Sequence, residues 1–180
     1  MKPPCIYLIA GEPSGDALGA GLMRGLKVDA PELEFVGIGG EAMQKEGLKS
    51  LFPYRELSIM GFAEVVPHIP QLLKRIEETK RDIAEKHPVA VVTIDSPGFN
   101  FRLAAALRDA PETTAIKRIH YVAPSVWAYK PKRAAKTAKL YDLLLALLPF
   151  EPRYFEKEGL KSVFTGHPVI WQNWRGDSAA

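Results

Sequence analysis

Cysteine is almost absent from this sequence, in which Cys5 is the single one among 180 residues. An internal disulfide is therefore excluded, and such cysteine usage is typical of a reducing compartment. Long apolar runs are also missing, because no window approaches the length of a membrane span and the first run, residues 6–10, lacks a processing site. We therefore expect a cytoplasmic protein without a signal peptide.

A strong excess of charge of one sign is missing as well. The sequence has 24 basic and 21 acidic residues, and a net charge of +3 is too weak to indicate nucleic acid as a partner. The four histidines lie far apart without the spacing of metal ligands, so we expect no metal site. His87 and His120 are interpreted as structural, and His167 as a loop residue.

Hydrophobic residues, in contrast, make up 47% of the sequence, which is enough for a sizeable core. Apolar strands without alternation, separated by helices, predict an α/β fold with a Rossmann-like parallel sheet and helices on both faces. The predicted strands are 5–10, 33–40, 89–95, 116–124, 142–150 and 161–168. The predicted helices are 16–27, 41–47, 71–86, 99–109, 129–141 and 151–159.

Loops that directly follow the predicted strands are the places to look for a site, because ligands of such sheets bind beyond the carboxyl ends of the strands. GEPSGD, residues 11–16, is the first of them. A helix starting near Gly15 would direct backbone N–H groups at an anion. Alternatively, this loop is a plain turn with Asp16 or Ser14 as the helix cap. It has neither the GxGxxG spacing of a dinucleotide site nor the GxSxG of a nucleophile elbow.

IDSPGFN, residues 94–100, is the sharper signal, because it places Asp95 at the end of an otherwise apolar strand. Desolvation there would raise the pKa of the carboxyl group toward that of a useful base. Pro97 and Gly98 predict a tight turn, after which Asn100 opens the next helix. In the alternative interpretation, Asp95 only caps this turn.

Two further segments combine residue types that suit an acylated or phosphorylated ligand. In PSVWAYKPKR, aromatic side chains suit a sugar or an acyl chain and the cations suit a phosphate, although a basic run is more often a solvated helix face. SIMGFAEVVPHIP, residues 58–70, is either a core segment, which composition alone favours, or a patch that touches lipid.

Seven motifs occur in one order along the sequence: AGEPSGD, GIGGEAM, LSIMGFAEV, IDSPGFNFRLA, YVAPSVWAYKPKR, LLPFEPRYFEKEG and TGHP. Together they closely resemble the lipid-A-disaccharide synthases, from residue 6 to residue 169. The resemblance implies a two-domain glycosyltransferase fold of the B type, of which residues 1–168 are the acceptor-side domain. Residues 169–180 would begin the linker to a C-terminal UDP-binding domain, and this chain alone is then expected to be inactive.

The family resemblance also implies a reaction. The donor would be UDP-diacylglucosamine and the acceptor diacylglucosamine 1-phosphate, joined in an inverting transfer to a β-1,6 disaccharide with release of UDP. No cofactor or metal is expected. A smaller departure from the family is Gly98, where some members carry an acidic residue. The alternatives are an NAD-type enzyme, which the absent GxGxxG disfavours, and a ligand-binding domain without catalysis.

Site residues follow from the resemblance and from the loops together. Asp95 would be the catalytic base that takes the proton of the acceptor 6-hydroxyl. The residues expected to bind the acceptor are Glu12, Ser14, Gly15, Asn100, Ser125, Trp127, Lys130 and Arg133. Those expected to contact acyl chains, or the cytoplasmic face of the inner membrane as a peripheral protein, are Ile59, Met60, Phe62, Val65 and Val66.

Overall fold

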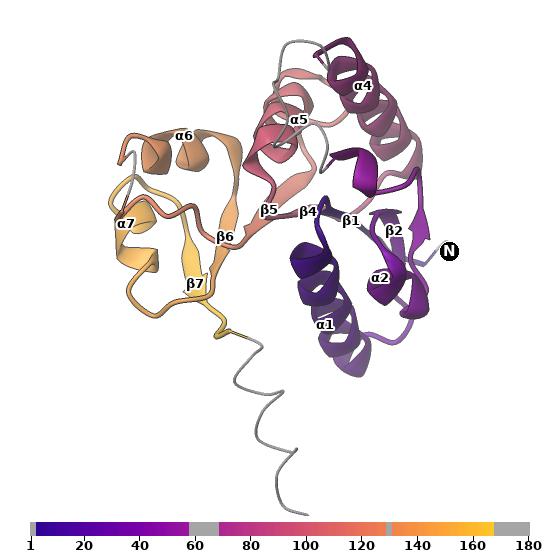
Figure 1. Cartoon of the computed structure of the whole chain (residues 1–180), viewed down its shortest axis with the longest axis horizontal. Helices are drawn as coiled ribbons and strands as arrows, with labels where there is room; N and C mark the ends of the chain where they lie inside the picture. The colour runs from indigo at the N-terminus through magenta and orange to yellow at the C-terminus, as the bar shows by residue number, and fades with distance from the viewer. Residues whose placement is uncertain (1–2, 58–68, 129–130, 168–180) are drawn as a thin grey trace, which may run out of the picture.

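The computed structural model describes residues 3–57, 69–128 and 131–167 (Figure 1). The described residues form one seven-stranded sheet with the order β3-β2-β1-β4-β5-β6-β7, and every neighbouring pair is parallel. The strands are β1 (Cys5–Ala10), β2 (Glu34–Ile38), β3 (Lys49–Ser50), β4 (Ala90–Ile94), β5 (Lys117–Tyr121), β6 (Leu143–Ala146) and β7 (Ser162–Phe164). The predicted α/β fold class is confirmed.

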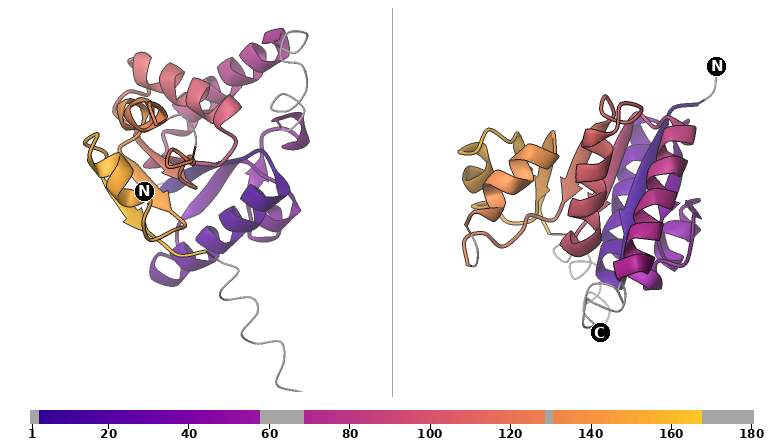
Figure 2. Two further views of the ribbon diagram at one scale, coloured as in Figure 1. Left: turned by 60° about the vertical axis from the view of Figure 1, so that its left-hand side comes forward. Right: turned by 90° about the horizontal axis from the view of Figure 1, so that it is seen from above.

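Helices cover both faces of this sheet, and Figure 2 shows the strands between the two helix layers. The helices are α1 (Pro13–Asp29), α2 (Glu41–Lys45), α4 (Ile69–Lys86), α5 (Pro97–Asp109), α6 (Arg133–Leu140) and α7 (Pro152–Glu156). α1 packs with α2, while α4 packs with α5, α5 with α6, and α6 with α7. No helix in the described ranges is both long enough and apolar enough to cross a membrane.

The central strand β1 explains why the sheet needs two covered faces. All six of its residues are buried. Tyr7 and Ile9 belong to the core cluster that includes side chains of α4 and α5, whereas Ile6 and Leu8 belong to the cluster that includes those of α1 and α2. Successive side chains of a strand point to opposite faces, so an uninterrupted apolar strand must be buried on both.

α1 begins three residues earlier than predicted, because Pro13 rather than Asp16 sets its first turn. Proline is favoured at the first helical position, where its fixed φ suits the helix and its missing N–H is not needed. Glu12 occupies the N-cap position without a side-chain hydrogen bond to the helix. The prediction that Asp16 or Ser14 caps this helix is therefore wrong.

Asp16 instead caps the neighbouring helix α2. Its carboxylate is buried and accepts hydrogen bonds from the backbone N–H groups of Gly40 at 2.8 Å, Ala42 at 2.9 Å and Met43 at 3.1 Å. A Cβ atom at Gly40 would lie 2.5 Å from the Asp16 carboxylate, so this close approach requires glycine. The GEPSGD and GIGG loops are thus joined by one buried side chain.

The other differences from the predicted elements are small. α5 starts at Pro97, so Asn100 lies within its first turn instead of opening it. The two-residue strand β3 was not predicted, and α4 begins two residues before the predicted helix 71–86. Several predictions lie outside the described residues: the linker segment 169–180, Lys130, and the lipid-contacting residues Ile59, Met60, Phe62, Val65 and Val66.

Candidate functional site

The centre of the sheet is a topological switch point. From β1 the chain runs to β2 and β3 on one side, whereas β4 to β7 extend the sheet on the other side. The loops after β1 and β4 therefore diverge and leave a crevice between them, which is the usual ligand position in open α/β sheets. The two loops nevertheless touch, since a Cβ atom at Gly11 would lie 2.8 Å from Oγ of Ser96.

Two carboxyl groups lie at this crevice, Asp95 after β4 and Glu12 after β1. Burial raises the pKa of the half-buried Asp95, and a hydrogen bond from the Ser96 backbone partly opposes the shift. The pKa of Glu12 is also raised, first by burial and then by the charge of Asp95. A carboxylate with a raised pKa is a stronger proton acceptor, which suits a general base.

Backbone strain is concentrated at the same place. Asp95, Ser96 and Val122 all have positive φ angles, of 48°, 44° and 80°. This region favours glycine, and a β-branched residue such as Val122 is an exceptional occupant. Each such residue costs about 1–3 kcal/mol, and strained residues of this kind cluster at active sites and ligand clamps.

A cavity of about 300 Å³ adjoins these strained residues, and we refer to it as the Asp95 cavity. Its lining consists of Asp95, Pro97, His120, Val122, Ala123, Pro124, Ser125 and Arg133. The structure thus brings together three of the residues predicted from the sequence, namely Asp95, Ser125 and Arg133. Sequence analysis missed Val122 and treated His120 as structural only.

Asn100 is fully buried and is not among the lining residues of the Asp95 cavity, and its Oδ1 has no hydrogen-bond partner among the described residues. Its Nδ2 donates hydrogen bonds to the carbonyl oxygen of Asp95 at 2.8 Å and to that of Ile94 at 3.3 Å. Two contacts with carbonyl oxygens also fix the orientation of the amide. Asn100 therefore anchors the end of β4.

A chain of buried hydrogen bonds continues from Asn100 to His120. Oη of Tyr141 donates to the Asn100 carbonyl at 3.2 Å and accepts from Oγ1 of Thr93 at 3.1 Å. Nδ1 of His120 lies 2.8 Å from Oγ1 of Thr93 and so joins the same chain. Burial lowers the pKa of His120 to about 3, so the imidazole is neutral near pH 7.

The remaining predicted residues lie around the crevice in different environments. Ser14 is exposed in the first turn of α1, where backbone N–H groups lack partners within the helix. Gly15 is buried, and a Cβ there would lie 3.5 Å from side-chain atoms of Ala10 and Ile94. Trp127 is exposed and packs edge-on against Phe150 with ring centroids 5.5 Å apart, and it is not among the lining residues of the Asp95 cavity.

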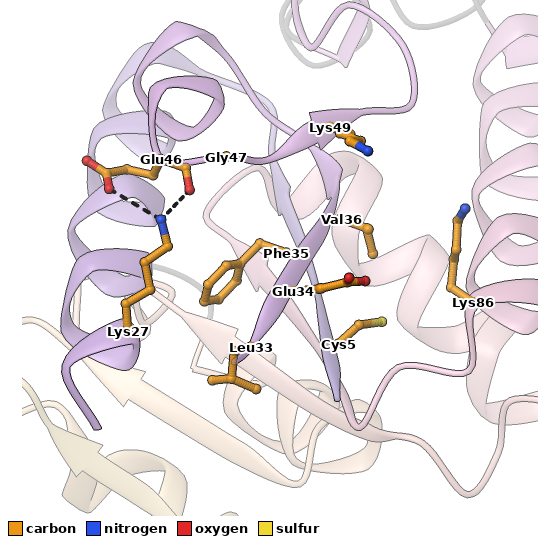
Figure 3. A pocket seen from close by; sticks show the side chains of 10 residues that line it. All are labelled: Cys5, Lys27, Leu33, Glu34, Phe35, Val36, Glu46, Gly47, Lys49 and Lys86. Atoms are coloured by element: carbon orange, nitrogen blue, oxygen red, sulfur yellow. Dashed lines mark hydrogen bonds and ion pairs between the residues drawn. The ribbon is translucent and has the colours of Figure 1, made fainter. Parts of the chain in front are cut away.

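A larger cavity of about 450 Å³ lies at the opposite, amino-terminal edge of the sheet (Figure 3). Its lining includes Cys5 and Glu34, the first residues of β1 and β2. The Lys27 ammonium within it already donates to the Glu46 carbonyl at 2.5 Å and lies 3.7 Å from the Glu46 carboxylate. None of its lining residues is a non-glycine residue with a positive φ angle, so the Asp95 cavity is the better candidate for the site.

Metal ligation has no support in the described part of the chain. There, no group of three or more His, Cys, Asp or Glu side chains is arranged to hold an ion. The Asp95 cavity itself offers a carboxyl group of raised pKa together with a hydroxyl and a guanidinium, supplied by Ser125 and Arg133.

Comparisons with known proteins agree on one family. A family profile described as "Lipid-A-disaccharide synthetase" matches residues 6–174. A lipid-A-disaccharide synthase of Paramagnetospirillum magneticum is 56% identical over 97% of this chain and 45% of its own length, and that of Rhodospirillum centenum is 54% identical over 94% and 42%. The chain therefore spans less than half the length of the curated relatives it matches.

Among solved structures, a UDP co-structure of S. aureus MnaA is similar in fold. Its TM-score is 0.61 at 17% sequence identity, and the similarity covers 93% of this chain and 45% of that chain. At this identity the likeness concerns the fold alone.

Proposed function

The chain belongs to the lipid-A-disaccharide synthase family, and we propose that it forms the acceptor-binding half of such a glycosyltransferase. In this proposal, residues 1–168 are one Rossmann-like domain of a two-domain B-type fold, and residues 169–180 begin the connection to a UDP-binding domain. The coverage of the relatives supports this division, because this chain matches less than half of each.

The proposed reaction joins two acylated sugars. The 6-hydroxyl oxygen of diacylglucosamine 1-phosphate attacks the anomeric carbon of UDP-diacylglucosamine, the bond from that carbon to the UDP oxygen breaks, and UDP leaves. The attack inverts the anomeric centre and gives the β-1,6 disaccharide. The hydroxyl proton must pass to a base, because an alkoxide does not form freely near neutral pH.

Asp95 is the proposed base, and its position carries the proposal. It is half-buried on the wall of a cavity at the switch point, its backbone is strained, and burial raises its pKa. Ser125 and Arg133 line the same cavity and are proposed to hold the acceptor. Asn100 is assigned a different role from the one expected, that of a positioning residue for Asp95.

The other predicted contacts remain proposals of the same kind. Glu12, Ser14 and Gly15 come from the loop after β1, while Trp127 and Lys130 come from the loop after β5. Trp127 is exposed enough to offer its face to a sugar or an acyl chain. α4 carries Lys74, whose charge would favour an anionic membrane surface, whereas the charge of Arg75 is already paired with Glu56 and Glu78.

Replacing Asp95 with Asn in the assembled two-domain enzyme tests the central proposal. Loss of the base should reduce kcat by about 10²–10⁴-fold without changing the circular dichroism spectrum. Asp109→Asn is the matched control, because Asp109 lies exposed at the far end of α5, the helix that follows Asp95, and forms its ion pair with the neighbouring Arg108. Near-normal turnover in Asp95→Asn would remove Asp95 as the base.

Membrane contact is tested separately. The double variant Met60→Ser with Phe62→Ser should weaken binding to anionic vesicles if the predicted apolar patch touches lipid. Unchanged vesicle binding would contradict that assignment and leave the acceptor site unaffected.

A further inference from the structure

A second cavity, of about 270 Å³, lies beside the Asp95 cavity, and we refer to it as the cationic cavity. The two cavities have Pro97, Pro124 and Arg133 in common, so they adjoin along this wall. The other lining residues of the cationic cavity are Gly98, Phe101, Arg102 and Lys136. These come from the first turns of α5 and from α6, which pack against each other.

The charge of this cavity is entirely positive. Arg102, Arg133 and Lys136 line it, and no carboxylate does. None of the three forms an ion pair with another residue in the described ranges, whereas Arg75 and Arg118 lie within 4 Å of carboxylates. Three cations that face one small space without a counter-ion repel one another, and an anion in that space would relieve the repulsion.

The start of α5 adds to the positive potential. Ser96 at the N-cap position makes no side-chain hydrogen bond to the helix, so N–H groups of the first turn are left for another acceptor. Gly98 opens onto free space, because a Cβ atom there would meet nothing within 4 Å. The guanidinium of Arg102 donates to the Gly98 carbonyl, which holds this cation at the helix start.

We propose that the cationic cavity binds a phosphate monoester, the 1-phosphate of the sugar acceptor. Arg102 and Lys136, which the sequence did not predict as site residues, would bind this phosphate. The proposal rests on the proposed function, in which the Asp95 cavity takes the reacting hydroxyl of the same molecule. Arg133 lines both cavities, so it contacts the sugar between its two ends.

Arginine and lysine contribute differently to such a site. The planar guanidinium of Arg102 can donate two parallel hydrogen bonds to a phosphate, while Lys136 acts as a point charge. The other lining side chains, those of Pro97, Phe101 and Pro124, carry no charge, so the cations alone set the sign of the cavity.

Calorimetric titration of the 180-residue chain with glucosamine 1-phosphate tests this proposal. Glucosamine, which lacks the phosphate, serves as the comparison ligand. The acyl chains are left out so that lipid contact does not contribute. We expect saturable binding of glucosamine 1-phosphate alone, and an affinity loss of about tenfold or more in Arg102→Gln and in Lys136→Gln. Equal binding of the two sugars would overturn the proposal.

Lys139→Gln is the matched control, because it removes the same charge from an exposed position of the same helix outside the cavity. Its affinity for glucosamine 1-phosphate should stay within twofold of the unchanged chain. A loss as large as in Lys136→Gln would mean that only the general positive charge of α6 matters, and the cavity would then have no special role.

Phospholipid headgroups carry phosphate as well, and vesicles of phosphatidylglycerol separate the two sources. If Arg102→Gln and Lys136→Gln weaken vesicle binding but not sugar phosphate binding, the cavity takes a lipid headgroup and the assignment to the acceptor is wrong. The outcome is also separable from that for Asp95. If phosphate binding depends on Arg102 but the Asp95→Asn enzyme stays active, the cationic cavity is supported as the phosphate site and Asp95 is not the base.

Discussion

The side-chain amide of Asn100 donates a 2.8 Å hydrogen bond to the main-chain carbonyl of Asp95, five residues before it. Asp95 has a φ of 48°, a conformation that persists only where its surroundings impose it. Asn100 is fully buried in the first turn of α5 and also holds the Ile94 carbonyl. The backbone of the proposed base is therefore held by the helix that follows it.

Asn100→Ala should consequently destabilise the chain by about 2–3 kcal/mol, because two buried carbonyl groups lose a donor and a small void is left. Urea unfolding followed by circular dichroism measures this difference. Gln44→Ala is the control, since Gln44 is exposed and donates to a single carbonyl at 3.3 Å, so its loss should cost about 0.5 kcal/mol or less. Equal losses would show that Asn100 does not anchor β4.

His120 predicts a pH dependence of stability. Burial holds its pKa at about 3, below the usual 6.5, so between these values the unfolded chain binds a proton that the folded chain does not. Stability should therefore fall as the pH falls from about 6.5 toward 3, by up to about 1.4 kcal/mol per pH unit from this residue.

The variant His120→Phe removes this contribution, and urea unfolding at several pH values between 4 and 7 gives the slope for each protein. The raised pKa of Asp95 acts in the opposite sense, because a carboxyl that is protonated more readily when folded loses stabilisation as the pH rises. Asp95 is present in both proteins, so the difference of their slopes belongs to His120. Identical slopes would contradict its burial as a neutral imidazole.

Asp16→Ala should destabilise the chain by about 2–3 kcal/mol, because three backbone N–H groups at the start of α2 lose a charged acceptor. Thermal unfolding detects this change. Asp29→Ala removes the same group from an exposed position at the end of α1 and should have little effect. If the two variants have the same melting temperature, the Asp16 carboxylate does not hold α1 and α2 together.

Gly37 and Gly98 should respond oppositely to alanine. At Gly37, with φ of +133°, a Cβ atom would lie 2.0 Å from the Leu8 carbonyl oxygen, so Gly37→Ala should prevent soluble expression. Gly98 lies in the first turn of α5 and a Cβ there meets nothing, so Gly98→Ala should leave the melting temperature unchanged or raise it. A soluble Gly37→Ala protein of unchanged melting temperature would show that β1 and β2 are less closely paired.

The sheet was predictable because its strands are short, uninterrupted apolar runs, and such runs are typical of parallel sheets with two covered faces. The positions of Asp95 and Ser125 followed from the same pattern, since both come after predicted strands. The start of α1 was mispredicted because Asp16 was given more weight than Pro13, and that of α5 because Pro97 and Gly98 were interpreted as a turn before the helix, whereas both prolines lie in the first helical turn.

Other features of the site depend on contacts between distant residues, which local patterns do not contain. Asp16 binds the backbone of Gly40, and Thr93 meets His120 and Tyr141 only after two strands and two helices, β4 to α6, have packed. The sequence does not distinguish Arg102 and Lys136 from other surface cations, because the hydrophobic periodicity of a helix does not indicate whether that helix adjoins the crevice. The cationic cavity is visible only once α5 and α6 lie side by side.

The position of β1 at the centre of the sheet also affects how the chain is made. Ile6 pairs with Phe35 on one edge, but its partner on the other edge is Ala90. A ribosome adds about 5–20 residues per second, so the backbone N–H and C=O groups along one edge of the apolar strand β1 stay unpaired for several seconds of translation. The nascent chain is thus open to aggregation or to a chaperone until β4 emerges, and slow codons between the two strands would prolong that interval.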